Sequence, residues 1–483
     1  MAASFFFYDL ETSGFDPRGA RIVQFGGQRT DMELNPIGEP IDVMIKLTPD
    51  VLPDPDAILV TGITPQQTIT EGITEAEFLN LFYNEVVQAD TIFVGFNSIR
   101  FDDEFMRFLH YRNFYDAYEW QWTNGCSRWD LLDMVRMTRA LRPDGINWPF
   151  ASNGKPANRL EFLTSVNHLD HKNAHNALND VYATIAVAQL VRSKQKDLFE
   201  YLLANRDKKK VAALVEAGKP FAYTSGRYPS EQLHTTAAVL LAKHPQEGAA
   251  LVYDLRHDPT PFLNMTTAEI VEAWRFTRNP AAVRLPVKTL KYNRCPAVAP
   301  LGVMSDAETQ ERLDLELATI TKHLALLRPE QATFAKKVLE AVAQLNSERT
   351  KDQTALVDDE LTVDARLYDG FISPQDKQVM GVVRAAKPEV LTSYVSKLSD
   401  ARFKSLLPLY KARNYPNALN SEERAAWDNF CQRKLFEGGN SSRLAKYFAR
   451  LQELAEGKLT AQHEYLLEEL QLYGQSIMPA EAS

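Results

Sequence analysis

A strongly apolar strand that ends in two acids constrains this chain most: FFFYDLETSG, at residues 5–14. The aromatic run at residues 5–8 is typical of a buried strand. Alternate residues of a strand point to the same face, so Asp9 and Glu11 project together while Leu10 points the other way. Two neighbouring carboxylates repel each other, and burial adds a desolvation cost, unless a cation lies between them. A solvated strand end is the alternative to a metal site, and this stretch alone leaves both open.

Two further segments place acids where they can meet the first pair. FNSIRFD, residues 96–102, follows a strand-like run and puts Asp102 at the start of an expected helix. HNALND, residues 175–180, leads into a segment of helical composition. His175 and Asp180 can converge if the helix begins near Ala177 and His175 lies on the loop before it. Asp103 is the alternative to Asp102, although an acid in the first turn of a helix has an ordinary structural role.

The three motifs D-x-E, N-x-x-x-F-D and H-x-A-x-x-D, in this order, resemble the DEDDh family of 3′-to-5′ exonucleases. Further segments narrow the likeness to its bacterial exodeoxyribonuclease I branch and extend it over nearly the whole chain. These segments are LVTGITPQQ, IRFDDE, HYRNFYDAY, SRWDLLDMVR, ALRPDGINWP, NAHNALNDVYATIA, RLYDGF and YKARNYP.

The resemblance implies an α/β fold in three parts. A ribonuclease H-like exonuclease domain, with a mixed sheet flanked by helices, precedes an SH3-like β-containing domain and an all-helical C-terminal domain. We expect these parts at residues 1–195, 196–350 and 351–483. The texture of the sequence agrees, because short apolar runs broken by Pro and Gly follow residue 222 and helical periodicity follows residue 365. A chain of 483 residues is also too long for a single core.

The motifs define a catalytic set. We assign Asp9, Glu11, Asp102 and Asp180 as ligands of two Mg²⁺ ions, with Mn²⁺ as a substitute, because Mg²⁺ prefers hard oxygen ligands and two ions suit phosphodiester hydrolysis. His175 is the expected general base, since an unperturbed pKa of about 6.5 suits proton transfer near neutral pH. A core or capping histidine is the alternative.

Contacts with substrate are expected just beyond the acids. Glu11, Thr12 and Ser13 can meet the terminal nucleotide, and Leu10 can flank its base, whereas turn hydrogen bonds and core packing are the alternatives for these residues. Arg142 is assigned to the substrate and also to a protein partner.

That partner is implied by the resemblance: the acidic C-terminal tail of single-stranded-DNA-binding protein. Arg142 would clamp the terminal carboxylate of the tail in bidentate fashion, and Tyr201 would wall an apolar pocket. The alternative is that Arg142 pairs with Asp144 or with a helix end.

The leading function is degradation of single-stranded DNA from the 3′ end to 5′-mononucleotides, in DNA repair and recombination. An RNA-trimming exonuclease of the same family and a catalytically inactive DNA-binding scaffold are the alternatives. The net charge of −9 argues against a protein that coats nucleic acid at random.

Other features indicate where the protein works. No apolar run approaches the roughly 20 residues of a membrane span, and the first residues carry no secretory signal pattern. Three scattered cysteines suggest buried thiols in a reducing compartment. We therefore expect a monomer in the cytoplasm, without membrane contact.

Overall fold

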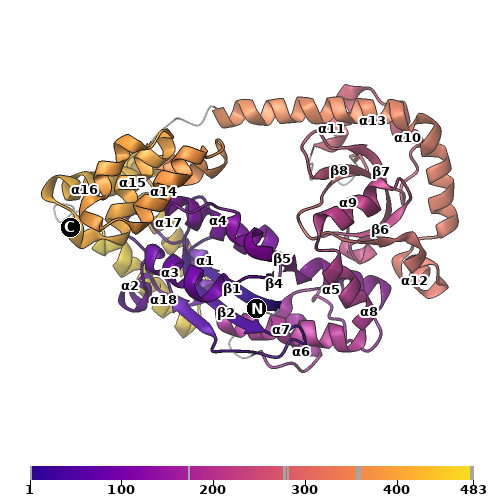
Figure 1. The fold of residues 1–483 in the computed structure, drawn as a ribbon. Helices are drawn as coiled ribbons and strands as arrows, with labels where there is room; N and C mark the ends of the chain where they lie inside the picture. The colour runs from indigo at the N-terminus through magenta and orange to yellow at the C-terminus, as the bar shows by residue number, and fades with distance from the viewer. Residues whose placement is uncertain (1–2, 172–174, 276–278, 280–281, 355–359, 479–483) are drawn as a thin grey trace. The chain divides into compact units, whose positions relative to one another are not determined.

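The computed structural model describes residues 3–171, 175–275, 279, 282–354 and 360–478 (Figure 1). The chain forms two compact units. Unit 1 comprises Met1–Ser127, His171–Ile185 and Asp358–Ser483, and unit 2 comprises Arg128–Asp170 and Ala186–Val357. Within the described residues, no helix is both long enough and apolar enough to span a membrane.

The sheet of unit 1 is mixed. β1 (Ser4–Thr12) pairs antiparallel with β2 (Ile22–Thr30) and parallel with β4 (Thr91–Gly95), and β3 (Ile41–Met44) pairs antiparallel with β2. The aromatic run explains the central place of β1, because a strand buried on both faces reads as a continuous apolar run. The mixed sheet and the antiparallel meander predicted for the first three strands are confirmed.

Helices cover the sheet of unit 1. Phe6, Tyr8 and Leu10 of β1 belong to a core that also contains Phe78 and Phe82. Two helices begin as the sequence predicts, with Thr64 capping α2 and Thr74 forming a capping box with Glu77 at α3. The helical elements are α1 (Pro55–Thr61), α2 (Pro65–Glu71), α3 (Glu75–Leu81), η1 (Phe82–Val86), η2 (Ser98–Arg100), α4 (Asp102–Arg112), η3 (Glu119–Gln121) and η4 (Thr123–Gly125).

The C-terminal helices share a core with α4. The Tyr111 and Phe403 rings lie 5.4 Å apart between centroids, and Phe114 lies 5.3 Å from Tyr410. Figure 1 shows α14 and α15 beside α4. The elements of this segment are η7 (Glu360–Tyr368), α14 (Pro374–Ala385), η8 (Pro388–Lys397), α15 (Ala401–Asn414), η9 (Pro416–Ala418), α16 (Ser421–Phe436), η10 (Gly439–Ser441), α17 (Arg443–Ala455) and α18 (Ala461–Ser476). The predicted helical character of residues 365–475 is therefore confirmed.

Unit 2 contains a second, antiparallel sheet in the order β10-β6-β7-β8-β9. Its strands are β6 (Phe221–Thr224), β7 (Thr235–Lys243), β8 (Ala249–Asp254), β9 (Val287–Lys291) and β10 (Ala297–Pro300). The long helix α13 (Leu317–Thr354) packs against β7. The β-rich character predicted for residues 222–300 and the helical character predicted after residue 301 are both confirmed.

The remaining helices frame this sheet and lead into it. They are α5 (Leu131–Leu141), α6 (Leu160–Val166), α8 (Lys196–Ala204), α9 (Lys208–Glu216), η5 (Ser230–Gln232), α10 (Thr260–Leu263), α11 (Thr267–Trp274), η6 (Leu301–Met304) and α12 (Ala307–Leu313). β5 (Ser127–Asp130) and α7 (Ala177–Lys194) extend from one unit into the other. The basic stretch from Gln195 to Lys210 is largely helical, because Phe199, Leu202 and Leu203 give α8 a buried apolar side.

Candidate active site

Three of the predicted acids meet at the end of β1. One ligand oxygen from each of Asp9, Glu11 and Asp180 lies within 4.8 Å of the other two. Glu11 is buried, and the other two acids are partly buried. The side-by-side projection expected from D-x-E thus occurs, and α7 adds the third carboxylate.

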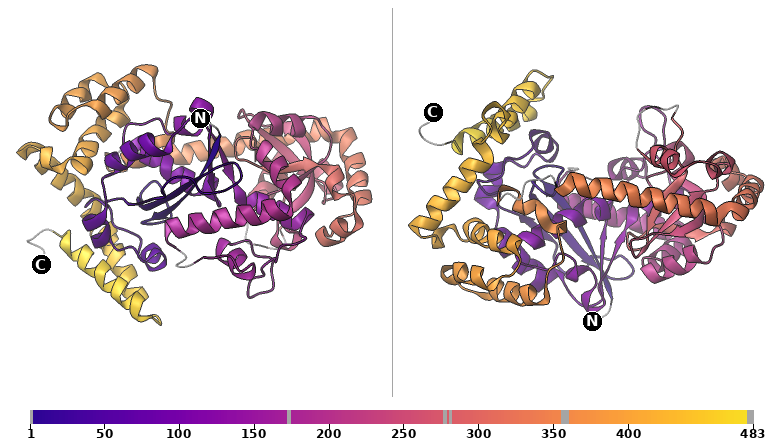
Figure 2. Two further views of the ribbon diagram at one scale, coloured as in Figure 1. Left: turned by 60° about the horizontal axis from the view of Figure 1, so that its bottom comes forward. Right: turned by 90° about the horizontal axis from the view of Figure 1, so that it is seen from above.

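The approach of α7 to the sheet depends on a glycine. Gly26 of β2 is the register partner of Asp9, and a Cβ atom at Gly26 would lie 2.4 Å from the backbone of Ala177. Gln24, two residues earlier, accepts a hydrogen bond from the backbone N–H of Ala177 at 3.2 Å. These contacts hold the first turn of α7 against β2, and the left-hand view of Figure 2 shows this helix lying along the sheet. Asp180, one turn into α7, therefore faces Asp9.

Asp102 and Asp103 have different surroundings at the start of α4. Asp103 accepts a hydrogen bond from the Tyr8 hydroxyl at 2.7 Å and lies 3.7 Å from the Arg107 guanidinium. Asp102 is close enough to Asp9 for its charge to raise the pKa of that carboxyl. The two neighbours thus have different surroundings: Asp103 is bound within the protein framework, whereas the charge of Asp102 acts on Asp9, although Asp102 is not among the acids whose ligand oxygens lie within 4.8 Å of one another.

The electrostatics of the cluster favour a bound cation. Burial, followed by the charges of Asp102 and Asp180, raises the pKa of Asp9 well above its ordinary value. Burial and the Asp180 charge raise the pKa of Glu11 to about 8, and burial raises the pKa of Asp180. Hard carboxylate oxygens that repel one another are the donors that Mg²⁺ or Mn²⁺ prefers, so the residues fit a divalent metal.

Two histidines lie next to Asp180. α7 begins at Ala177, and His175 lies on the preceding loop, as the motif requires; it is exposed, and its backbone N–H hydrogen-bonds the Asp180 carboxylate. His171 was missed by the sequence reasoning: its Nε2 lies 2.6 Å from Asp180 Oδ1. The residues between 171 and 175 lie outside the described part of the chain. A histidine nine residues before the acid has no helical periodicity to mark it, so only the folded loop shows this contact.

The residues predicted to meet substrate have mixed surroundings. Leu10 is buried in the core, and the Thr12 hydroxyl donates to the carbonyl of Gly14 at 2.9 Å. Ser13 is 1% exposed, and both its N–H and its hydroxyl are hydrogen-bonded to the backbone of Arg21. Ser13 therefore shapes the turn that follows the acids.

Arg142 and Tyr201 lie in unit 2, on two helices that pack together. Arg142 is exposed and ends α5, where its Nη1 donates to the carbonyls of Leu141 at 2.5 Å and Val303 at 3.4 Å. Tyr201 is half-buried on α8, and burial raises the pKa of its hydroxyl. The Arg142 side chain thus makes the helix-end contact that the sequence left as the alternative, while its exposure leaves guanidinium surface open.

Comparisons with known proteins follow the same division of the chain. Residues 6–188 match the family described as Exonuclease, residues 206–344 the Exonuclease I SH3-like domain, and residues 361–477 the Exonuclease I C-terminal domain. The exodeoxyribonuclease I of Haemophilus influenzae is 40% identical over 462 residues, covering 94% of each chain.

Solved structures agree over almost the full length. Escherichia coli exonuclease I in complex with a dA16 oligonucleotide is 36% identical with a TM-score of 0.90, covering 99% of this chain and all of that one. A structure described as SSB/Exonuclease I in complex with an inhibitor is 36% identical with a TM-score of 0.87, over the same shares.

The mixed sheet, the acidic cluster at the end of its central strand and the family matches define a metal-dependent exonuclease with a ribonuclease H-like domain. The identity over nearly the whole chain goes further: the protein belongs to the exodeoxyribonuclease I family. It is a hydrolytic nuclease.

We expect the stability of the metal-free protein to fall as the pH rises. The pKa of Glu11 is about 8 in the fold and 4.5 as its ordinary value, so the fold favours the protonated carboxyl and loses stability as that proton leaves. Asp9 and Asp180 shift in the same direction. Thermal melting in a chelator, between about pH 6.5 and about pH 8, should show a falling midpoint; histidines also titrate from about pH 6.5, so the Glu11→Gln variant is the reference that separates the two effects.

Two comparisons isolate the cause of that fall. Glu11→Gln should flatten the dependence, because the amide does not ionise. Added Mg²⁺ should raise the midpoint most at the upper pH, where the carboxylates are free of protons. A midpoint that is constant in the parent, or that falls equally in Glu11→Gln, would contradict the assignment.

Proposed function

We propose that this protein removes 5′-mononucleotides from the 3′ end of single-stranded DNA by two-metal hydrolysis, in DNA repair and recombination. The observation that carries the proposal is the convergence of Asp9, Glu11 and Asp180 at the end of β1. The likeness to an exonuclease I solved with a dA16 oligonucleotide supports DNA as the substrate.

The proposed ligands are Asp9, Glu11, Asp102 and Asp180, holding two Mg²⁺ ions, with Mn²⁺ as a substitute. When bound, the ions supply charge that activates a water and neutralises the leaving oxygen. His175, exposed beside Asp180, takes the proton of the attacking water. His171 donates its Nε2–H to Asp180 and so orients that carboxylate, in the way that outer residues commonly orient metal ligands.

For the terminal nucleotide, we propose contacts with Glu11 and with the Thr12–Gly14 turn. Ser13 acts by holding that turn, since its polar groups already bind Arg21. Leu10 supports the site from the core beneath it. We also propose that the exposed guanidinium of Arg142 contacts the DNA strand, in addition to its proposed contact with a protein partner.

The alternatives are less well supported. A scaffold without activity has no need of a group of carboxylates whose pKa values are raised by burial and, for Asp9 and Glu11, also by neighbouring acids. An RNA-trimming exonuclease has no need of the SH3-like and C-terminal domains, which match over residues 206–344 and 361–477. These matches also support the proposed division at residues 1–195, 196–350 and 351–483. The three cysteines form no disulfide, which supports a reducing, cytoplasmic setting.

Isosteric variants test the proposed ligands. Asp9→Asn, Glu11→Gln, Asp102→Asn and Asp180→Asn should each remove most of the turnover, because each removes a ligand charge and leaves side-chain volume nearly unchanged. Mg²⁺-dependent release of nucleotides from labelled DNA and RNA oligomers measures this, and DNA should be the preferred substrate. Asp103→Asn is the matched control, since an amide oxygen can still accept from Tyr8. A ligand variant within about tenfold of the parent, a barrier difference of about 1.4 kcal/mol, would lose its assignment.

His175→Ala tests the general base. Turnover should fall by roughly 10²–10⁴-fold near neutral pH, and raising the pH should restore part of it as hydroxide replaces the missing base. His171→Ala is the informative comparison: it removes an orienting contact, so its loss should not recover with pH. Full activity of His175→Ala at neutral pH would show that the base lies elsewhere.

We further propose that unit 2 binds the acidic C-terminal tail of single-stranded-DNA-binding protein. The structure described as SSB/Exonuclease I, which this chain resembles at 36% identity, supports such a partner. Arg142 offers a planar guanidinium to the terminal carboxylate, and the half-buried ring of Tyr201 offers an apolar wall. Lys208, Lys209 and Lys210 at the start of α9 add positive charge for the other acids of the tail.

Arg142→Ala should weaken binding of a labelled acidic-tail peptide by about tenfold or more, because a charged hydrogen-bonded contact is lost. Arg142→Lys should recover only part of the affinity, since lysine cannot bind the carboxylate with two parallel hydrogen bonds. Arg275→Ala, which removes an exposed cation at the end of α11, is the charge-matched control. Fluorescence anisotropy measures the affinities, and equal values for Arg142→Ala and the parent would end the proposal.

A further inference from the structure

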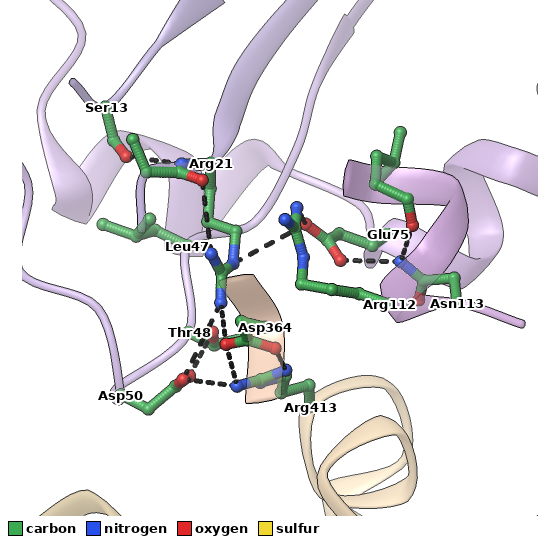
Figure 3. Close-up of polar contacts among 12 residues, drawn as sticks. Ser13, Arg21, Leu47, Thr48, Asp50, Glu75, Arg112, Asn113, Asp364 and Arg413 are labelled. Atoms are coloured by element: carbon green, nitrogen blue, oxygen red, sulfur yellow. Dashed lines mark hydrogen bonds and ion pairs between the residues drawn. The ribbon is translucent and has the colours of Figure 1, made fainter. Parts of the chain in front are cut away.

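Buried charges join the C-terminal helices to the strands of unit 1 (Figure 3). The Arg21 cluster, as we call it, consists of Arg21, Asp50, Asp364, Arg413 and Lys434. Their side chains are at most 6% exposed. Three cations face two carboxylates here, and they hold the pKa of Asp364 well below its ordinary value even though burial acts to raise it.

The cluster is centred on two carboxylates that Arg413 holds together. Arg413 donates to both oxygens of Asp364 at 2.8 Å, and its Nη2 also donates to Asp50 at 2.7 Å. Lys434 Nζ donates to the same oxygen of Asp50 at 2.7 Å. Asp50 lies in the loop after β3, whereas its partners Arg413 and Lys434 come from α15 and α16. The cluster therefore ties the C-terminal segment to the N-terminal strands by charge as well as by apolar packing.

Arg21 carries this connection to the active site. Its Nη2 donates to Asp364 Oδ2 at 2.8 Å. Its backbone forms a reciprocal pair with Ser13: the Ser13 N–H donates to the Arg21 carbonyl at 2.8 Å, and the Arg21 N–H donates to Ser13 Oγ at 2.9 Å. Ser13 lies two residues after Glu11. A single residue thus links a buried carboxylate of the C-terminal segment to the turn that follows a proposed metal ligand.

The sheet itself gives this turn little support. The register of β1 with β2 shifts between Glu11 and Thr12, so the regular ladder is broken just beyond the acids. The turn is held instead by the Arg21–Ser13 pair and by the backbone N–H of Asp54, which donates to the Ser13 carbonyl at 2.7 Å. The position of Glu11 at this edge therefore depends on contacts outside the ladder.

A second set of contacts connects Arg21 to α4. Arg21 Nε lies 3.9 Å from Glu75, which accepts hydrogen bonds from Arg112 at 2.8 Å and Asn113 at 2.7 Å, as Figure 3 shows. Arg112 is the last residue of α4, the helix that begins at Asp102. Arg21 is therefore also connected, through Glu75 and Arg112, to the end of α4 opposite Asp102.

Stability alone does not explain such a cluster. Well-packed apolar side chains of similar volume often stabilise a core as well as buried ion pairs do, whereas removing one partner of a buried pair is costly. Hydrogen bonds between charged groups do, however, fix geometry more narrowly than apolar contacts. The cluster lies beside the point where the β1–β2 ladder is broken, so its fixed geometry can hold the turn that follows Glu11.

We propose that Arg21 is a positioning residue for catalysis. Held by Asp364 and Arg413 of the C-terminal helices, it fixes the Thr12–Gly14 turn and thereby the placement of Glu11 toward the metal and the terminal nucleotide. This inference rests on the proposed role of Glu11 as a ligand. It assigns the C-terminal segment a direct effect on the active site, independent of any contact with DNA.

Asp364→Asn tests the proposal in the full-length protein. It removes the charge that Arg21 binds and leaves all proposed ligands in place. The Mg²⁺ concentration for half-maximal turnover, and for the half-maximal rise of the melting temperature, should both increase roughly tenfold, the usual effect of altering a group that orients a ligand. Saturating Mg²⁺ should restore part of the lost turnover.

The matched control is Glu423→Gln, which weakens a Lys411–Glu423 ion pair at 2.7 Å formed entirely within the C-terminal helices. It should lower the melting temperature while leaving both Mg²⁺ dependences unchanged. Ser13→Ala is the milder second variant, because it deletes only the hydroxyl that accepts from Arg21 and leaves the buried charges intact. It should shift both Mg²⁺ dependences in the same direction by a smaller factor, and it can be measured even if Asp364→Asn does not fold.

Normal Mg²⁺ dependences in Asp364→Asn or in Ser13→Ala, whatever the melting temperature, would overturn the positioning role. Failure of the proposed function gives a different result, because the parent protein itself would then show no Mg²⁺-dependent release of nucleotides from DNA.

Discussion

The structure of unit 1 has to hold together carboxylates that repel one another. Asp9, Glu11 and Asp180 bring ligand oxygens within 4.8 Å of one another in a partly buried space, and the pKa of Glu11 rises to about 8 as a result of burial and the Asp180 charge. Such a cluster has to be held by the rest of the fold, because each acid gains from moving apart or out to water. A central buried strand holds two of the acids, and the contact of α7 with Gly26 holds the third. The cation that relieves the repulsion is also the one that the chemistry requires.

The C-terminal segment belongs physically to the nuclease strands. Its helices share a core with α4, where Tyr111 and Phe114 pack against Phe403 and Tyr410, and its charges complete the Arg21 cluster. The buried Asp50 would lose Arg413 and Lys434 without this segment, and an unpaired buried charge costs several kcal/mol. The C-terminal domain therefore matches its own family model, yet its helices share a buried core with the exonuclease domain.

Polar networks in this protein differ in what they do. Asp103 with Tyr8 and Arg107 anchors the start of α4, next to Asp102, whose charge acts on Asp9. His171 contacts Asp180 directly, whereas Arg21 acts at a distance through Ser13. In each case a side chain outside the acidic cluster restricts the movement of an acid or of the turn beside it. Catalysis by positioned groups depends on such restricted geometry.

The sequence by itself determined which acids we propose as metal ligands, their order along the chain and the elements that carry them. Asp9 and Glu11 project to the same side because side chains alternate along any strand. The starts of α4 at Asp102 and of α7 at Ala177 agree with the local sequence around each motif. Only the tertiary structure decided which distant groups meet. His171 at Asp180, Gly26 beneath Ala177 and Asp364 on Arg21 leave no periodic signal, because contacts between residues far apart in the chain depend on how whole elements pack. Only the tertiary structure likewise shows that Leu10 and Ser13 are buried, since the motif alone left both substrate contact and a place in the core or turn open.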